Sequence, residues 1–489
     1  MMTLRTLAAA LTLCLAPVAH AGWEDAVNAY NRGDYGVAAK EFRPFAEQGQ
    51  ATAQYILGWI YQNGEGVPQD YAESARWYEK AAQKDNAEAQ YALGYYYMTG
   101  SGVAQDNARA ATWFRKAASG TPGKAGAQYL LGYLLARGEG VPPNEPEAAL
   151  WYRKAADQGY ADAQYALALA LSSGTGVEKD ESAANEWLRR AAEQKHIEAA
   201  YLLGWNAERG VGVLPDYAEA ARWYRQAAEG GNPDAQYQLA TLLRDGRGAA
   251  KDEVQALALF QKAAAAGQPS IPSTVDEYLR AGRPEPAFAL ADTWLERYPD
   301  DVQLLTVLGV SAANGARTEP GRFVAPARDY GNRAIVAIER GTKPAGLDDA
   351  QWNEYRTRWL PQLHLRLGTI AQKAGPLEEA RSRFLKVTEL DPSDPYAWYF
   401  LGQTHFTEYE RISAASKGLE GAAKSEAVGR AFGELDRVIE YYARAVSAAE
   451  AQQNLKDLRD PVMRDLQGVY EFRNGSLSGL DEVLARYRK

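Results

Sequence analysis

The chain has 489 residues, of which 46% are hydrophobic and 24% charged, and its formal net charge is −9 at pH 7. This length exceeds what one compact core supports, so we expect two or three domains or a repeat array. Positive and negative residues are interspersed along the chain, without the basic patches that displace counterions. This argues against nucleic acid and anionic lipid as the main partners.

Residues 1–21 have the pattern of a signal peptide. Arg5 precedes a short apolar run, and an A-x-A cleavage site ends at Ala21, so the mature chain is expected to begin near Gly22. The apolar run is too short to span a bilayer, and no later stretch approaches the roughly 20 apolar residues that a spanning helix needs. We therefore expect a periplasmic or secreted protein and not an integral membrane protein.

Cys14 is the only cysteine and lies in the middle of the apolar run. A lipidated cysteine should follow a small residue, but Leu13 precedes this one, so a lipoprotein is disfavoured. After cleavage at Ala21 the chain would contain no cysteine, which predicts neither disulfides nor thiol chemistry.

Residues 22–51 are expected to form an N-terminal capping half-repeat, and residues 52–268 then repeat two short phrases with a period of about 36 residues. The first phrase begins as AQYILG at 53–58 and the second as ARWYEKAA at 75–82. Six copies of each phrase follow one another in phase. Self-similarity at such a period is typical of a solenoid of helical hairpins.

Each copy predicts a helix, a glycine turn and a second helix. The glycine pair between the phrases begins with Gly64 and Gly66 and supplies backbone with positive φ. The second phrase places Ala75, Tyr78 and Ala82 on one face. One hairpin cannot bury that face alone, so we expect the copies to stack.

Polar residues mark the expected start of each second helix, because their side chains accept a hydrogen bond from the first helical turn. Three glutamates lie three residues after their caps and predict capping boxes. The predicted caps are Asp70, Asp106, Asn144, Asp180, Asp216 and Asp252, and the glutamates are Glu73, Glu147 and Glu219.

These repeats resemble the Sel1-like repeat, a relative of the tetratricopeptide repeat. The resemblance implies an all-α, right-handed α-solenoid in which six Sel1-like repeats occupy residues 52–268. It also implies, for secreted bacterial members, a role as a protein–protein adaptor or scaffold of the cell envelope.

Residues 269–489 resemble tetratricopeptide repeats more closely. Gly368, Ala380, Phe384 and Pro392 have the spacing of that signature. A weaker copy before them is expected to be interrupted by a Gly/Pro-bearing insert near 314–326. The sequence predicts helices throughout and no strand.

Aromatic residues recur on one face of the first helices, spaced so that i and i+4 lie together. In tetratricopeptide geometry this face lines the concave surface, where Tyr and Trp offer large contact area with a polar handle. The first tyrosine of each copy belongs to the family consensus, so packing between helices is an alternative for that set. The candidate partner-binding residues are Tyr55, Trp59, Tyr91, Tyr95, Tyr129, Tyr133, Tyr165, Tyr201, Trp205 and Tyr237.

The chain offers little for catalysis or metal binding. His196, His364 and His405 have no ligand-type neighbours at metal spacing, and no nucleophile–base pair stands out. We therefore predict no catalytic residue, no metal and no cofactor, and a hydrolase is the least favoured reading. The function predicted is a non-enzymatic adaptor that binds an envelope protein, and the alternative is binding of exopolysaccharide or peptidoglycan on the same aromatic face.

Overall fold

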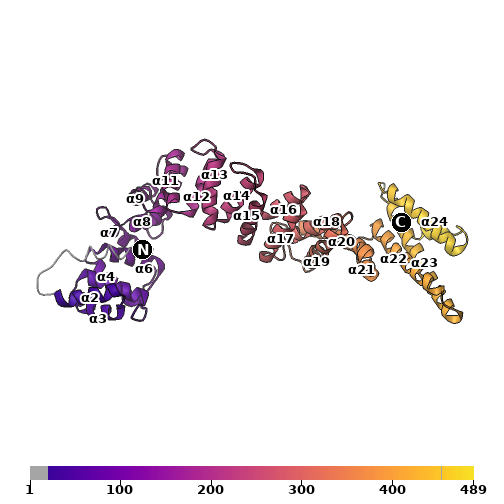
Figure 1. Ribbon diagram of the computed structural model, residues 1–489, viewed down its shortest axis with the longest axis horizontal. Helices are drawn as coiled ribbons and strands as arrows, with labels where there is room; N and C mark the ends of the chain where they lie inside the picture. Colours follow the sequence, from indigo (N-terminus) through magenta and orange to yellow (C-terminus); the bar gives the residue numbers. More distant parts are fainter. Residues whose placement is uncertain (1–19, 453, 489) are drawn as a thin grey trace. The chain divides into compact units, whose positions relative to one another are not determined.

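The protein is α-helical throughout residues 20–452 and 454–488, which the computed structural model describes, and these residues contain no strand. This confirms the all-α prediction. The chain divides into two compact units, residues 1–259 and 260–489, and Figure 1 shows the helices following one another as hairpins in both. Cys14 and residues 1–19 of the predicted signal peptide lie outside the described residues.

Unit 1 begins with a hairpin of α2 (His20–Arg32) and α3 (Tyr35–Glu47). Phe42 from this hairpin is fully buried in one cluster with Ile56 and Leu57 of the first repeat. The ring of Trp23 stands edge-on to that of Phe42, with 5.2 Å between centroids. The hairpin therefore covers the apolar end of the repeat array.

The six repeats then follow as helical hairpins, as the sequence predicts. The first helices are α4 (Ala51–Asn63), α6 (Ala87–Thr99), α8 (Ala125–Arg137), α10 (Ala161–Ser173), α12 (Ile197–Arg209) and α14 (Pro233–Asp245). The second helices are α5 (Tyr71–Ala82), α7 (Asn107–Ala118), α9 (Glu145–Asp157), α11 (Glu181–Glu193), α13 (Tyr217–Glu229) and α15 (Glu253–Ala266), which crosses the boundary between the units.

The two glycines of each turn have different tasks. Gly64 has φ 72° and ends α4 as a left-handed cap. The second glycine of the next turn, Gly102, has φ 69°, and a Cβ there would lie 2.1 Å from the carbonyl oxygen of Tyr71 in the preceding repeat. Consecutive repeats therefore approach through backbone at this point, which a side chain would prevent.

The predicted caps of the second helices are confirmed, but the predicted capping boxes at Glu73, Glu147 and Glu219 are wrong. In the first repeat the backbone N–H of Asp70 donates to the carbonyl of Tyr61 at 3.0 Å, so it has no need of a glutamate acceptor. The Glu73 carboxylate instead accepts from Trp77 Nε1, one turn further on, at 2.9 Å. Trp151 and Trp223 donate in the same way to the other two glutamates, at 3.2 Å each.

A glycine in the first helix lies against an aromatic ring of the second. A Cβ on Gly58 would lie 2.5 Å from the ring of Tyr78, which is almost fully buried. The fourth repeat differs at both positions, with Ala168 in the first helix and Leu188 in the second. The sixth repeat pairs Ala240 with Phe260, so the glycine accompanies an aromatic ring in the other four repeats.

Buried glutamines join each first helix to the end of the preceding second helix. Gln90 Nε2, for example, donates to the carbonyl of Ala82 at 3.1 Å. The fifth repeat has Ala200 at this position, and there Gln226 of the next second helix donates to the equivalent carbonyl, that of Ala192, at 2.6 Å. We call this hydrogen bond between a first helix and the end of the preceding second helix the clamp. The glutamine of the sequence phrase AQY makes it, and periodicity alone does not reveal this role.

Unit 2 continues with longer and less regular helices. Gly368 lies against Phe384, where a Cβ would be 2.6 Å from the ring, so the tetratricopeptide-like pair repeats the geometry of Gly58. The expected interruption near 314–326 is wrong, because Pro320 begins a 20-residue helix that tolerates Pro326 in its second turn. The helices are α16 (Ile271–Arg280), α17 (Pro284–Arg297), α18 (Val302–Gly315), α19 (Pro320–Glu339), α20 (Asp349–Ala374), α21 (Leu377–Leu390), α22 (Pro395–Ser416), α23 (Gly421–Glu450), α24 (Lys456–Asn474) and α25 (Leu480–Ala485).

Candidate partner-binding face

The candidate residues of unit 1 form two columns along the first helices, and together these columns make up what we call the first-helix face. The two columns lie four residues apart in each helix, so they share one side of it. The first column is Tyr55, Tyr91, Tyr129, Tyr165, Tyr201 and Tyr237, and the second is Trp59, Tyr95, Tyr133, Leu169, Trp205 and Thr241.

Tyrosines of the first column pack against the second helix of their own repeat. The ring centroid of Tyr55 is 5.7 Å from that of Tyr78, and Tyr201 lies 5.9 Å from Tyr224 in the fifth repeat. Burial raises the pKa of Tyr55 to about 12, and it raises the pKa values of Tyr91, Tyr129, Tyr165 and Tyr201 as well. These rings are half-buried, so the first column contributes to packing within each repeat.

The residue that precedes the next first helix covers the other side of several of these rings. Tyr160 approaches Tyr129 with 5.5 Å between centroids, and His196 stacks on Tyr165 at 4.7 Å. Sequence reasoning did not single out this position. Its signal was present, because each of these residues directly precedes a first helix and recurs with the same period.

Charged side chains span neighbouring repeats on the same face. Lys124 Nζ lies 2.6 Å from a carboxylate oxygen of Glu88 and 5.2 Å above the ring of Tyr91. His196 Nε2 lies 3.5 Å from Asp162. Each pair joins the first helix of one repeat to the start of the next, so the face has mixed charge.

The second column is exposed at two positions, Tyr95 and Leu169. Tyr95 is 45% exposed, and Tyr133 and Trp205 are half-buried. Among the described residues, none forms a hydrogen bond with the hydroxyl of Tyr95 or Tyr133 or with the indole N–H of Trp205. Arg137 and Arg209 lie over the rings of Tyr133 and Trp205, at 5.3 and 4.9 Å from the centroids.

Trp59 differs from the other aromatic residues of the second column. Its ring packs against Tyr30 and Tyr35 of the capping hairpin, with centroid distances of 5.5 and 5.3 Å. The structure therefore places Trp59 in a structural contact, whereas Tyr95 has an open ring face.

A small apolar cavity of about 240 Å³ opens beside Leu169, where the second column has no aromatic residue. Tyr152 lines one side of it, and Ala166 and Ala170 line the other. The alanines of α10 leave this space unfilled, so the cavity is wide enough for a single apolar side chain.

The histidines lie in structural positions. Burial and the nearby charge of Arg383 lower the pKa of His364 to about 4. His405 Nδ1 is 2.5 Å from a carboxylate oxygen of Glu434, yet burial still lowers its pKa. Across residues 20–452 and 454–488, no three His, Cys, Asp or Glu side chains come together as metal ligands. Within the same residues, no helix is long and apolar enough to cross a membrane.

Comparison with known proteins identifies the family to which the six repeats are similar. The family model for the Sel1 repeat matches residues 51–86, 87–121, 125–160, 161–196, 197–232 and 233–268. The crystal structure of c5321, a protective antigen of uropathogenic Escherichia coli strains with an SLR fold, is 25% identical and covers 92% of this chain and 96% of that chain, with a TM-score of 0.53. A Sel1 repeat protein from Oxalobacter formigenes is 30% identical and covers 50% of this chain and 96% of that chain, with a TM-score of 0.45. No curated protein matches the sequence.

Proposed function

The chain belongs to the Sel1 repeat family, whose repeats generally serve as scaffolds for protein interactions, and we propose that it is a non-enzymatic adaptor of the bacterial cell envelope. The partner is a protein held on the first-helix face of unit 1. The envelope location rests on the signal-peptide pattern of residues 1–21.

The observation that carries this proposal is the second column. Tyr95, Tyr133 and Trp205 offer ring area that neighbouring helices leave partly open, and their polar groups have no hydrogen-bond partner among the described residues. Tyr and Trp with a free polar group are enriched at protein interfaces because one side chain supplies apolar area and a hydrogen bond together.

The face also favours a particular kind of segment. The cavity beside Leu169 accepts one apolar side chain. An extended segment or a helix with a large apolar residue would therefore bind across the third and fourth repeats. Most of its binding energy would come from that buried anchor.

Site-specific photo-crosslinking in the periplasm tests this proposal. A photo-reactive phenylalanine derivative replaces Tyr95 in one variant and Tyr71, an exposed tyrosine on a second helix, in the matched control. We expect a crosslinked protein only from position 95. Affinity for the purified protein should then fall at least about tenfold on changing Tyr95, Tyr133 and Trp205 to alanine.

The triple variant needs its own control, because the loss of apolar surface alone can weaken association. Leu150, Leu214 and Val254 are exposed apolar residues outside the two columns, and their replacement by alanine should leave affinity unchanged. Equal weakening in both triple variants would contradict the assignment to this face. If quenching of Trp205 fluorescence by peptidoglycan or exopolysaccharide fragments occurs without any crosslinked protein, the face binds glycan instead.

A further inference from the structure

Helices α22 and α23 of unit 2 extend past their neighbours. α23 has 30 residues and α21 has 14, a difference of about 24 Å at 1.5 Å per residue. In Figure 1 the far ends of α22 and α23 run on together as an orange hairpin past α21, and Phe472 and Arg473 of α24 contact its base at Tyr409 and Phe432. We call this paired end, residues 407–434, the hairpin end. The sides of the hairpin end beyond these contacts are therefore open to solvent, whereas the sides of other repeat hairpins pack against the next hairpin.

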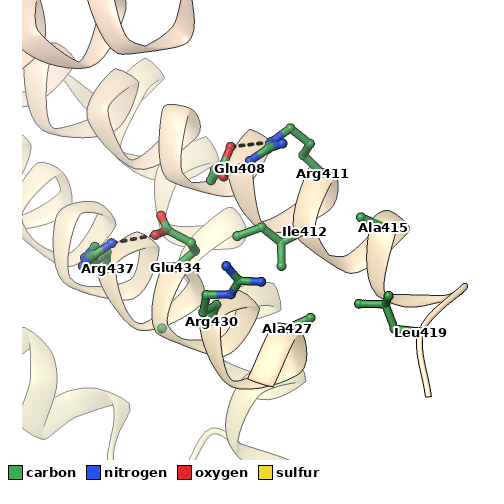
Figure 2. Close-up of a pocket in the computed structure, with 10 residues that line it drawn as sticks. Glu408, Arg411, Ile412, Ala415, Leu419, Ala427, Arg430, Glu434 and Arg437 are labelled. Carbon is green, nitrogen blue, oxygen red and sulfur yellow. Dashed lines mark hydrogen bonds and ion pairs between the residues drawn. The ribbon is translucent and has the colours of Figure 1, made fainter. Parts of the chain in front are cut away.

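A crevice of about 640 Å³ lies between the two helices of the hairpin end. Figure 2 shows Ile412 on α22, Leu419 on the connection that follows α22, and the side chain of Arg430 reaching across from α23. Ile412 is half-buried and Leu419 is exposed, so the crevice has an apolar floor that water reaches.

The charged residues of the crevice are unequally paired. Glu408 and Arg411 form one ion pair at 2.6 Å, and Glu434 and Arg437 form another at the same distance. No residue that the structure describes forms an ion pair or a hydrogen bond with the guanidinium of Arg430. The crevice therefore carries one uncompensated positive charge, in a chain whose net charge is −9.

A fourth arginine, on the neighbouring helix α21, adds to the positive electrostatic potential of the crevice. Arg381 of α21 has two buried nitrogens, Nε and Nη2, without a hydrogen-bond partner. The hydrogen bond from Arg411 lowers the pKa of Glu408, and the positive charge of Arg381 lowers it further. Glu408 pairs with Arg411 and Glu434 pairs with Arg437, which leaves Arg430 as the free anion-binding group of the crevice.

We propose that this crevice binds an acidic peptide segment in which a carboxylate lies next to a large apolar side chain. The carboxylate pairs with Arg430, whose planar guanidinium donates two parallel hydrogen bonds to its oxygens. The apolar side chain covers Ile412 and Leu419. A polyanion such as nucleic acid fits less well, because Glu408 and Glu434 would repel successive phosphates. This site lies in unit 2 and is independent of the first-helix face.

The test uses the full chain and a fluorescein-labelled, end-blocked peptide in which a single glutamate lies between two leucines. Fluorescence anisotropy should show saturable binding that weakens at least about tenfold in Arg430→Glu. Lys424→Glu is the matched control, because Lys424 is an exposed cation on the same hairpin end that does not line the crevice. Its affinity should stay within about twofold of the unmodified chain, and circular dichroism should show equal helicity in both variants.

Three outcomes would overturn the proposal. The first is the absence of saturable binding at millimolar protein. The second is equal weakening of binding by both charge reversals, which would indicate only general attraction to a cationic surface. Third, if a peptide with glutamine for glutamate bound as well as the original, the carboxylate would have no role. Leu419→Asp is a second test of the apolar contact. This variant should bind the peptide more weakly, while inorganic sulfate should compete with the peptide at the same concentration as in the unmodified chain.

Discussion

The glycine at position 58 illustrates how one missing side chain sets the distance between two helices. Gly58 lies directly under the ring of Tyr78, and the hydroxyl of that tyrosine donates to Gln62 Oε1 at 2.7 Å. The ring is therefore held at its far end and cannot shift to make room. Gly58 is therefore a packing surface for this ring.

We expect Gly58→Ala to destabilise the repeat by up to about 2 kcal/mol. The added methyl overpacks the ring by roughly 1–3 kcal/mol, and the better helix propensity of alanine returns about 1 kcal/mol of that. In a Tyr78→Leu background, which copies the pairing of Ala168 and Leu188, the same change should be neutral or stabilising. Urea unfolding followed by circular dichroism measures both values, and an equal cost in the two backgrounds would refute the explanation.

The contact between consecutive repeats depends on glutamine side chains that donate a hydrogen bond from one helix to a carbonyl at the end of another. The buried glutamines of the AQY phrase donate to the carbonyl at the end of the preceding second helix, as Gln164 does to Ala156 at 3.2 Å. Where Ala200 replaces the glutamine, Gln226 of the next second helix approaches the same carbonyl position from another direction. The bond is thus retained although the residue that makes it changes.

Gln226→Ala should therefore cost about 1 kcal/mol, because the carbonyl of Ala192 loses its side-chain donor. A second change, Ala200→Gln, should restore most of this stability by rebuilding the clamp found in the other repeats. Ala200→Gln alone serves as the control and should have little effect. Chemical denaturation of the three variants measures the effect, and a double variant no more stable than Gln226→Ala would show that the clamp is not transferable.

The arrangement of unit 1 as a row of hairpins makes its stability a sum of neighbouring contacts. Each repeat buries its apolar face only against the next, so the end of the row needs a cover. The hairpin of α2 and α3 supplies it, burying Phe42 against Ile56 and Leu57. Trp59 packs on the same hairpin and helps to hold it in place.

Deletion of residues 22–49 is expected to loosen the first repeat most. Hydrogen exchange should accelerate strongly in α4 and α5, less in α6 and α7, and hardly at all in α12 and α13, because the lost contacts are local. Phe42→Ala should give the same gradient with a smaller amplitude. Unchanged exchange in α4 and α5 would mean that the hairpin does not stabilise the array.

The number and boundaries of the repeats follow from the amino-acid sequence alone, because a period of about 36 residues recurs in apolar positions, glycines and caps at once. The helix starts at Asp70 and its equivalents were predictable for the same reason, since capping is local. The role of Gln90 depended on tertiary structure, because its partner lies in another helix, whereas Glu73 and Trp77 are i, i+4 neighbours in one helix.

The candidate sites divide in the same way. Helical spacing places Tyr55 and Trp59 on one face, but only the packed structure separates ring faces covered by neighbours from the open ring of Tyr95. The crevice at Arg430 has no counterpart in the periodic sequence pattern. It arises because α22 and α23 extend beyond the helices beside them. Local spacing encodes which residues share a helix face, whereas the exposure of that face depends on the lengths and positions of other helices.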